Sequence, residues 1–481
     1  MQFNSYIFIL LFLPLSVFVY FLLCRTQNKK VSNAFLVCAS LLFCGYAGIN
    51  NLCVLVLSIL INYFLYLLIN KNRKKQYLII GLLFNIIYLL AFKYSNFIFS
   101  NINSLIHTSI VLDKIVLPLA ISYYTFSQIS FLIDTYRGEI ENVDIIDYVL
   151  YVVYFPKLIE GPIMFFNELV SQFNDENRKK VNWDNIAIGI YAFIIGLSKK
   201  VLLADVFGKI ADLGFSNVSN LDTTNAIIVM LSYSLQIYFD FSGYCDMAIG
   251  TSKMFNIDLL ENFNSPYKSL SIIDFWNRWH ICLTRFFRKY LYIPLGGNRK
   301  GELRTCINTL IVFIVSGFWH GANWTFVLWG LTNGILLVIN KKYKDKLETA
   351  GPLFNGLLTF ILVNLLWVLF RANSISEAVL FVKNILQLHI GGIDYELAKL
   401  AISNDVMFIE KLIFGKQVIG ANHYLFMMLT IGLLIALGGK NRKELCENKK
   451  TRVIDVIISV LLLVLCIMSF SNISKFVYQF F

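Results

Sequence analysis

Residues 263–301 read FNSPYKSLSIIDFWNRWHICLTRFFRKYLYIPLGGNRKG, and residues 315–334 read VSGFWHGANWTFVLWGLTNG. These two segments carry five of the seven tryptophans, two of the five histidines and a Gly-Gly pair. The rest of the chain consists mainly of apolar runs, which offer few reactive groups. We therefore expect the polar and aromatic side chains of these segments to organise the fold and to form any reactive site.

The composition around these segments is that of a polytopic membrane protein. Hydrophobic residues make up 57% of the 481 positions and charged residues 15%, and the apolar residues come in blocks. An apolar helix needs about 20 residues to cross the hydrocarbon layer. The fold class predicted is all-α, with roughly 10–13 transmembrane helices plus re-entrant or interfacial amphipathic helices. The predicted spans are 5–24, 31–48, 52–70, 77–97, 115–134, 145–163, 186–206, 225–243, 305–321, 322–340, 352–370, 421–438 and 453–471.

The net charge of +12 does not indicate a nucleic-acid partner, because the basic residues lie in short loops between apolar runs. The basic loops 25–30 and 71–75 are separated by two predicted crossings, so both can face the cytoplasm, which places the N-terminus outside. The loops 341–346 and 440–452 are separated in the same way. The nine cysteines are mostly isolated inside apolar runs, without metal-ligand spacing, so neither a disulfide framework nor a metal site is predicted. The first apolar run lacks a basic n-region and a cleavage site, which favours a span over a removed signal peptide.

Polar groups interrupt the apolar runs in the middle of the chain. Residues 117–141 mix Ser, Tyr, Thr, Gln and Asp into an apolar run, and these groups need a polar interior or one another. The stretch YFPKLIEGPI, residues 154–163, holds two prolines and a glycine, so a helix must break there. Broken backbone at membrane depth lines a protein-enclosed cavity, and the alternative is a plain loop at the interface.

Two lysines and two carboxylates also lie inside apolar runs. We interpret Lys199 and Lys200 as a pair that extends to the cytoplasmic interface, with contact to the phosphates of a donor or lipid as the alternative. Asp240 and Asp246 are candidates for function because carboxylates at membrane depth are expensive. They can equally pair with Arg or Lys to hold helices together, and we favour that structural interpretation.

The central segment predicts one amphipathic helix over 272–292. At about 100° per residue, Arg278, Arg285 and Lys289 fall on one line of this helix, and aromatic residues occupy the opposite face. Such a helix is too charged to span and is expected to lie in the interface or to re-enter the protein. His280 lies at the edge of the aromatic face, where it is either a hydrogen-bonded packing residue or a functional group.

His320 is the strongest candidate for a catalytic base. If Arg304 marks the cytoplasmic surface, a helix reaches His320 after about 24 Å, most of the way across a hydrocarbon layer of about 30 Å. An imidazole this deep is expensive to charge, so a neutral ring with one nitrogen able to accept a proton is expected. Trp319 and Trp324 could wall a slot beside it. The histidines at 107, 389 and 423 have no comparable surroundings.

The combination of DFWNRWHICLTRFFRKYLYIPLGGNRKG with VSGFWHGANWTFVLWG resembles the membrane-bound O-acyltransferase (MBOAT) family, in particular its bacterial alginate O-acetyltransferase branch. The resemblance is strong over 117–372, and Lys289 and Cys245 depart from it where many relatives have Asp and Ser. It implies a single integral membrane domain, 1–481, made of N-terminal helices (1–115), a catalytic core (117–372) and a polar segment with C-terminal helices (373–481). Further blocks agree in order: PLAISYYTFSQISFLIDTYRG, YFPKLIEGPI, GLSKKVLLAD, QIYFDFSGYCDMAIG and LLWVLFRA.

What the resemblance implies is a central tunnel with the deep histidine, matching His320, as general base and His280 as a helper. The donor would be a thioester, acetyl-CoA or an acyl carrier, and the acceptor a hydroxyl on the outer side; no bound cofactor and no metal is required. A thioester already has a good leaving group, so the enzyme chiefly needs a base, hydrogen-bond donors for the oxyanion, and alignment. Candidates for lining the tunnel are Trp276, Arg278, Trp279, Trp319, Asn323 and Asp240.

Relatives of this type imply a bacterial cytoplasmic (inner) membrane protein that contacts membrane lipid and acetylates a cell-surface polysaccharide with an extracytoplasmic acetyltransferase partner. D-alanyl transfer to teichoic acid is the alternative within the family. A transporter or flippase of lipid-linked sugar is the alternative outside it, and would need inverted repeats or a path of charged residues, which the sequence does not show. A scaffold protein without enzymatic activity is the third alternative.

Overall fold

The computed structural model describes residues 1–108, 116–402, 410–411, 419–446, 453–470 and 476, and within these ranges the secondary structure is helical without strands. The predicted spans 115–134 and 453–471, the polar segment 372–420 and the basic loop 440–452 therefore extend partly outside the described residues. Two compact units form, one from Met1–Phe193 and Met247–Leu260 and the other from Ile194–Asp246 and Glu261–Phe481.

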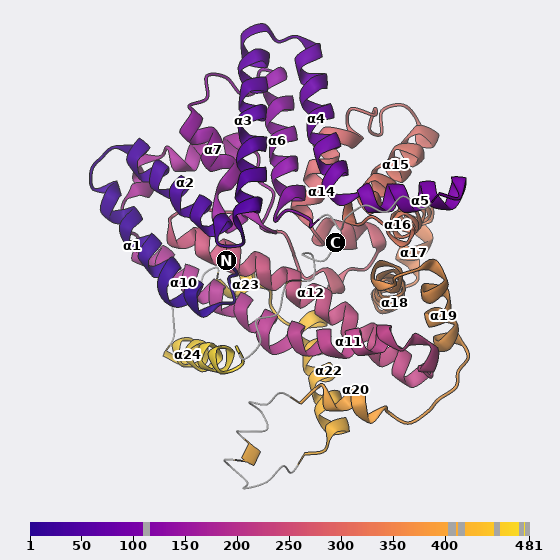
Figure 1. The fold of residues 1–481 in the computed structure, drawn as a ribbon. Coiled ribbons are helices and arrows are strands. Elements are labelled where there is room, and N and C mark those ends of the chain that lie inside the picture. Colours follow the sequence, from indigo (N-terminus) through magenta and orange to yellow (C-terminus); the bar gives the residue numbers. More distant parts are fainter. Residues whose placement is uncertain (109–115, 403–409, 412–418, 447–452, 471–475, 477–481) are drawn as a thin grey trace. The chain divides into compact units, whose positions relative to one another are not determined.

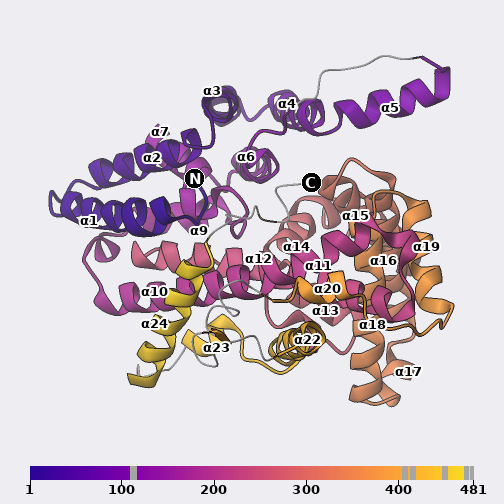
Figure 2. The same ribbon diagram turned by 60° about the horizontal axis from the view of Figure 1, so that its bottom comes forward.

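The first unit contains the N-terminal helices (Figure 1). Its elements are η1 (Ile7–Phe12), α1 (Leu13–Cys24), α2 (Lys29–Gly45), α3 (Ile49–Asn72), α4 (Lys75–Lys93), α5 (Ser95–Ile106), α6 (Ile121–Tyr136), α7 (Ile145–Val153), α8 (Phe155–Leu158), α9 (Phe166–Phe173), η2 (Glu176–Lys179) and most of α10 (Trp183–Ser198). Figure 2 views α3, α4 and α6 nearly end-on as neighbouring columns, and these three helices contact one another.

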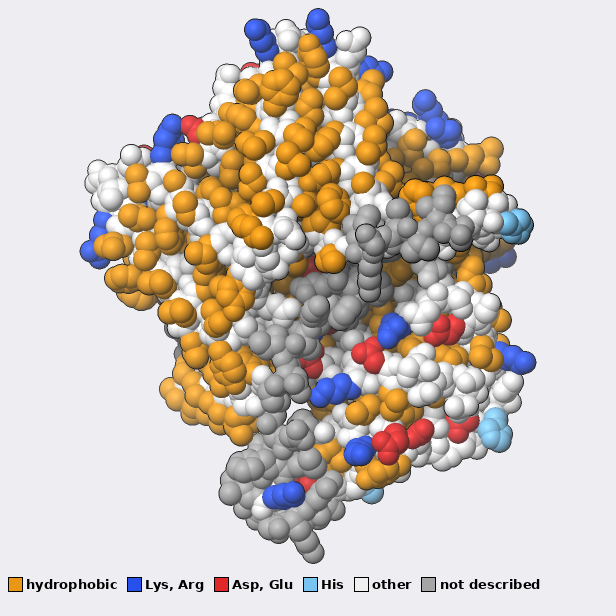
Figure 3. All heavy atoms as spheres, viewed as in Figure 1, with side chains coloured by type: hydrophobic (Ala, Val, Ile, Leu, Met, Phe, Trp, Pro, Cys, Tyr) orange, Lys and Arg blue, Asp and Glu red, His pale blue; other side chains and the backbone are white. Residues whose placement is uncertain are grey.

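Buried amides join those three helices. Asn85 on α4 donates to Asn62 on α3 at 2.6 Å, and Ser58 on α3 donates to Gln128 on α6 at 2.9 Å. Such bonds replace water for polar groups inside an apolar layer. The outer surface of α3 and α4 is apolar, with Lys and Arg at the tip of the hairpin (Figure 3), as expected for helices that face lipid and end at a membrane surface.

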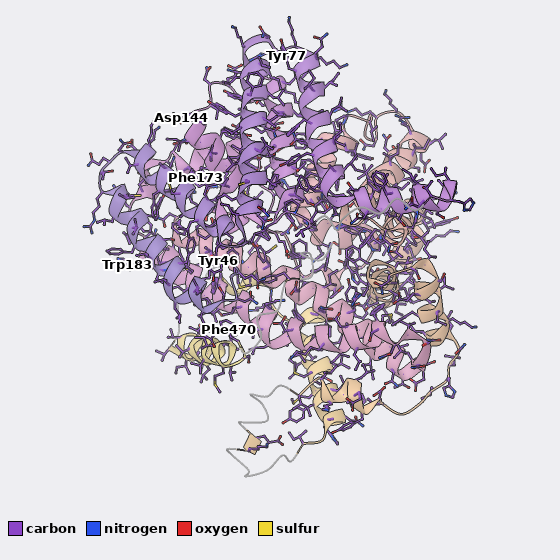
Figure 4. All side chains as sticks on the ribbon, viewed as in Figure 1. Tyr46, Tyr77, Asp144, Phe173, Trp183 and Phe470 are labelled. Carbon is purple, nitrogen blue, oxygen red and sulfur yellow. The ribbon has the colours of Figure 1, made fainter. Side chains whose placement is uncertain are left out.

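Side chains at the helix ends are polar. Figure 4 labels Tyr77 near the tip of the α3–α4 hairpin and Asp144 at the start of α7. Asp144 caps α7 by accepting a hydrogen bond from the Ile146 N–H at 2.9 Å, and it also pairs with Lys30 on α2 at 2.7 Å. One carboxylate therefore both begins α7 and fixes α7 against α2.

The second unit carries both segments that the sequence singled out. Its elements are η3 (Lys199–Ala204), α11 (Asp205–Ser216), η4 (Val218–Asn220), most of α12 (Thr223–Met254), η5 (Pro266–Lys268), α13 (Ile272–Arg278), α14 (Ile281–Phe287), η6 (Arg288–Tyr292), α15 (Glu302–His320), α16 (Trp324–Lys342), α17 (Lys344–Thr349), α18 (Pro352–Arg371), α19 (Ile375–Leu386), α20 (Tyr395–Lys399), α22 (Ala421–Leu437), α23 (Arg442–Cys446) and α24 (Val453–Met468).

The helices α15 and α16 form a closely packed hairpin. A Cβ added to Gly317 would lie 2.3 Å from the carbonyl oxygen of Phe326, and one added to Gly330 would lie 2.3 Å from that of Phe313. Only glycine permits this backbone approach, which is typical of helix pairs in membranes. The hairpin fixes the position of His320, the last residue of α15.

Seven described helices are long and apolar enough to cross a membrane: Ile7–Cys24, Ile49–Asn72, Lys75–Lys93, Trp183–Ser216, Thr223–Met254, Glu302–His320 and Pro352–Arg371. The apolar helices α22 and α24 are shorter. The all-α, multi-pass prediction is confirmed. The single span predicted over 145–163 is wrong, because α7 ends at Val153 and the four-residue helix α8 begins at Phe155, with Pro156 in its first turn. The chain therefore breaks within 154–163, as predicted.

Candidate active site

The segment 272–292 is not one helix. It forms α13, then His280 with a left-handed backbone (φ 48°, ψ 50°), then α14 and the π-helical turn η6. The Ile281 N–H does not continue the helix but donates to the backbone oxygen of Asn262 at 3.0 Å. The prediction that Arg278, Arg285 and Lys289 share one line of a helix is therefore wrong, since the break rotates the later turns away from the first.

His280 is held from several sides. Its Nδ1 lies 3.1 Å from Oδ1 of Asn262, and its ring meets the ring of Phe241 edge-on at 4.8 Å between centroids. Only 1% of the residue is exposed. Burial lowers the pKa of the imidazole to about 3, so His280 is neutral at physiological pH.

A cavity of about 680 Å³ opens beside His280. This volume lies within the range of small-molecule sites, about 300–1,000 Å³. Apolar side chains form much of its wall, and Ser316 and Thr284 add hydroxyl groups. Its lining includes Trp276, His280, Leu283, Thr284, Phe287, Tyr292, Thr309, Val312, Phe313, Ser316 and Leu337.

Cations surround one end of this cavity. Arg288 from η6 and Arg299 and Lys300 from the following turn line it, and all three are exposed. The turn reverses at Gly296 and Gly297, whose φ angles of 109° and 55° favour glycine. Asn308 on α15 holds the turn by donating to the carbonyl oxygen of Gly297 at 2.9 Å. Three exposed cations in the lining of a largely apolar cavity suit a ligand with an anionic end and an uncharged arm.

His320 lies behind an aromatic wall of the same unit. It is 4% exposed, and its ring centroid lies 4.8 Å from that of Trp319, 5.2 Å from Trp329 and 5.3 Å from Phe370. One turn earlier on α15, Ser316 lines the cavity. Aromatic rings thus form most of the surroundings of His320, as expected for a histidine deep in the protein.

Two tryptophans connect the cavity to His320. Trp276 lines the cavity and donates through Nε1 to Oδ1 of Asn333 at 3.2 Å. Its ring packs edge-on against Trp329 at 5.7 Å, and Trp329 packs against His320. Trp276 and Trp329 therefore link the lining of the cavity to the rings around His320.

The remaining predicted tunnel residues have structural contacts. Trp279 is buried against Phe275, Trp367 and other rings of the core. Arg278 pairs with Asp274 at 2.8 Å. Asn323 caps α16 by accepting from the Thr325 N–H at 3.1 Å, and it donates to the backbone oxygen of Asn373. None of these three is among the described residues that line the cavity.

Asp240 and the paired lysines form buried ion pairs. Lys200 lies 2.6 Å from Asp240 and 2.9 Å from Asp205, and Lys199 lies 2.6 Å from Asp246. The prediction that the lysines extend to the interface is wrong, because the π-helical turn η3 directs both ammonium groups to carboxylates inside the unit. Asp240 and Asp246 each pair with a lysine, which is the kind of contact that the preferred, structural interpretation predicted.

Within the described residues, no group of three or more His, Cys, Asp and Glu side chains is arranged to hold a metal ion. The sequence prediction did not identify Asn262 or Arg288 as site residues. Arg288 is next to Lys289, which the sequence analysis had singled out on the same segment, and this was a usable signal. Asn262 gave no local signal, since it reaches His280 only through the fold.

Comparison with known proteins gives the relatives of this chain. A family model described as membrane-bound O-acyltransferase matches residues 67–372, which include both histidines. The peptidoglycan O-acetyltransferase of Helicobacter pylori is 39% identical, covering 93% of this chain and 91% of the relative. The probable alginate O-acetylase of Pseudomonas aeruginosa is 38% identical, covering 79% and 73%. A teichoic acid D-alanyltransferase of Streptococcus thermophilus is 29% identical, covering 48% and 59%. The resemblance inferred from the sequence is confirmed.

Proposed function

This chain belongs to the membrane-bound O-acyltransferase family, and from that membership we propose that it moves an acetyl group from a cytoplasmic thioester to a hydroxyl of a cell-envelope polysaccharide. The observation that carries the proposal is the cavity of about 680 Å³ between His280 and a cationic rim. The protein is a multi-pass membrane O-acyltransferase, and we place it in the bacterial inner membrane, where a thioester donor and an extracytoplasmic acceptor meet across one bilayer.

The rim favours a donor that carries phosphate. Arg288, Arg299 and Lys300 offer donors and positive charge to a diphosphate or a phosphodiester, and the apolar wall accommodates an uncharged pantetheine-like arm. Acetyl-CoA and an acyl carrier protein share this chemistry. The arm would carry the thioester inward, past the rim and toward His280 and Trp276.

In the proposed reaction, the acceptor hydroxyl attacks the thioester carbonyl carbon. His320 takes the hydroxyl proton as the new C–O bond forms, the C–S bond breaks, and the departing sulfur receives a proton to leave as a thiol. His280 orients a substrate group by accepting a hydrogen bond. Aromatic rings around His320 exclude water, which would otherwise hydrolyse the thioester.

The identity of the acceptor follows from the relatives. The relatives that cover most of this chain act on peptidoglycan or alginate by their names, whereas the D-alanyltransferase covers about half of it. We therefore favour acetyl transfer to an envelope polysaccharide over D-alanyl transfer to teichoic acid. A separate extracytoplasmic acetyltransferase that completes delivery to the polymer fits this proposal. Family membership favours it over a transporter or a scaffold.

The test uses purified protein in lipid vesicles with radiolabelled acetyl-CoA inside and a hydroxyl-bearing polysaccharide outside. The wild type should transfer label outward, and His320→Ala should lower kcat by about 10²–10⁴. His423→Ala replaces an exposed histidine on α22 and should transfer like the wild type. Equal transfer by His320→Ala and wild type, with both folded, would remove His320 as the base.

If the wild type transfers nothing, an acyl carrier protein loaded with acetate replaces acetyl-CoA, and then an extracytoplasmic partner is added. Label that appears only with the carrier assigns the donor. If labelled polysaccharide forms only when the partner is present, this chain and the partner together deliver the acetyl group. Uptake of a lipid-linked sugar without any acetylation would favour the transporter.

A further inference from the structure

Asn262 contacts His280 in a way that fixes the position of a proton. Its Oδ1 accepts a hydrogen bond from the backbone N–H of Cys282 at 3.2 Å, and the same oxygen lies 3.1 Å from Nδ1 of His280. A backbone N–H can only donate, so the atom facing it must be the amide oxygen. Nδ1 of His280 must then be the nitrogen that carries hydrogen, because the oxygen can only accept.

The other end of the same amide is compatible with this orientation. Nδ2 of Asn262 donates to Sγ of Cys245 on α12 at 3.2 Å. A flipped amide would place its NH₂ group against the Cys282 N–H and its oxygen against the sulfur. A thiol can donate or accept weakly, so the Cys245 contact is compatible with the orientation, and the Cys282 N–H is the contact that requires it.

The loop that carries Asn262 is fixed on both sides. Glu261 pairs with Arg442 of α23, and Arg442 also lies 3.5 Å from Asp246 at the end of the second unit's part of α12. On the other side, the Asn264 N–H donates to the backbone oxygen of Arg278 at 2.9 Å. Asn262 itself receives the Ile281 N–H through its backbone oxygen. The amide is thus held by charge pairs and backbone bonds that do not involve the imidazole.

We propose that Asn262 is a positioning residue that holds His280 in the tautomer with hydrogen on Nδ1, so that Nε2 carries the lone pair. This inference rests on the proposed function only for its effect on rate, since the tautomer is a property of the resting protein. The left-handed backbone and the ring of Phe241 fix the direction of the imidazole, and Asn262 fixes which nitrogen accepts. His280 then offers an acceptor to a substrate O–H or N–H in the cavity, and not a donor to an oxyanion.

Solid-state NMR of ¹⁵N-histidine-labelled protein in lipid bilayers measures the tautomer directly. The signals of His280 are identified by their loss in His280→Gln. In the wild type, Nδ1 should show the shift of a protonated nitrogen and Nε2 that of an unprotonated one. Asn262→Leu, which has a similar shape but cannot accept, should move the protonation toward Nε2. Asn262→Asp, whose carboxylate still accepts, should keep hydrogen on Nδ1.

Asn384→Leu is the matched control. Asn384 is also buried in the second unit, where it donates to the backbone oxygen of Val218 at 2.7 Å, and it does not contact His280 in the described residues. Its replacement should leave the His280 signals unchanged. Hydrogen on Nε2 in the wild type, or an unchanged tautomer in Asn262→Leu, would overturn the proposal.

Acetyl transfer gives the second measurement. Asn262→Leu should lower kcat by about tenfold or more while KM for acetyl-CoA changes less, and Asn262→Asp should recover most of the loss. A changed tautomer with unchanged kcat would overturn the positioning role. Retained transfer in His320→Ala would overturn the proposed base without affecting the NMR result, so the two failures can be told apart.

Discussion

The two histidines lie in segments that are built in opposite ways. His320 ends α15, a continuous helix packed on α16 through glycines, and aromatic rings surround it. His280 separates two helices of seven residues each, has a left-handed backbone and lines a cavity with a cationic rim. The continuous hairpin provides a fixed, dry position, whereas the broken segment makes polar groups available to a ligand. Under the proposed function, two requirements of acyl transfer, exclusion of water and recognition of a charged donor, would be met by different segments.

The largest effect should come from a charge outside both segments. Asp240→Leu should lower the free energy of unfolding by about 3 kcal/mol, because Lys200 would lose one of its two carboxylates inside the unit. Replacing both partners, Lys200→Met with Asp240→Leu, should recover most of this stability and the acetyl transfer with it. The measurement is thermal unfolding in detergent together with the vesicle assay.

The single and the double variant together test whether the polar groups needed for the reaction lie only in the segments that carry His280 and His320. A stable double variant without transfer would show that Asp240 or Lys200 has a role in the reaction. Asp147→Asn in the first unit is a comparison, since Asp147 accepts from the uncharged Asn174 side chain at 2.8 Å. Its effect on stability should be smaller.

The second prediction concerns the close packing of α15 against α16. Gly317→Ala should lower the free energy of unfolding by about 2 kcal/mol, because the new Cβ would lie 2.3 Å from a backbone oxygen that cannot move alone. Gly356→Ala on α18 is the control, since its Cβ would lie 3.5 Å from Cδ2 of Leu270, an ordinary contact. Thermal unfolding of both variants measures the difference. Equal stability of the two would contradict the close packing that fixes His320.

The sequence predicted the hairpin well and the broken segment poorly, for a physical reason. The uncharged run from Thr305 to His320 and the glycines around it depend on local spacing, and the helix α15 has the expected end. The break at His280 depends on Asn262, which is distant along the chain and supplies both a backbone oxygen and a side-chain oxygen. Helical periodicity contains no information about such a partner. The cavity likewise depends on how the Gly296–Gly297 turn folds back toward α15.

The ion pairs of Lys199 and Lys200 also depend on contacts that the sequence alone does not reveal. Lys199 and Lys200 were predicted to extend to the cytoplasmic interface because long lysine side chains in an apolar run usually place their charge in water. The π-helical turn η3 and the separate partners Asp246 and Asp240 are visible only in the fold.

Of the three rings packed on His320, the sequence prediction named Trp319, whereas Trp329 and Phe370 come from α16 and α18 and were not predicted. Trp324, which was predicted to wall the same slot, is 55% exposed.

The third prediction concerns pH. Burial lowers the pKa of His280 to about 3, whereas a histidine in the unfolded chain titrates near 6.5. Below about pH 6.5 the unfolded state binds a proton that the folded state does not, so folding stability is lost as the pH falls. Between pH 6.5 and 5.5 this group alone should remove about 1 kcal/mol. His280→Gln should show a shallower decrease in melting temperature over that interval, and identical slopes would contradict the buried neutral imidazole.

The smallest effect should come from the cationic rim, where each exposed charge contributes little and salt screens it. Arg299→Ala should raise KM for acetyl-CoA about threefold at low ionic strength while kcat stays the same, because the phosphate contact proposed for this guanidinium would be equal in the ground and transition states. The difference from wild type should shrink in high salt. Lys341→Ala, an exposed lysine near the end of α16 that is not part of the described lining, should leave KM unchanged. A lower kcat with constant KM in Arg299→Ala would mean that the rim acts on the chemical step. The proposal that the broken segment binds the donor while the hairpin provides the base would then be wrong.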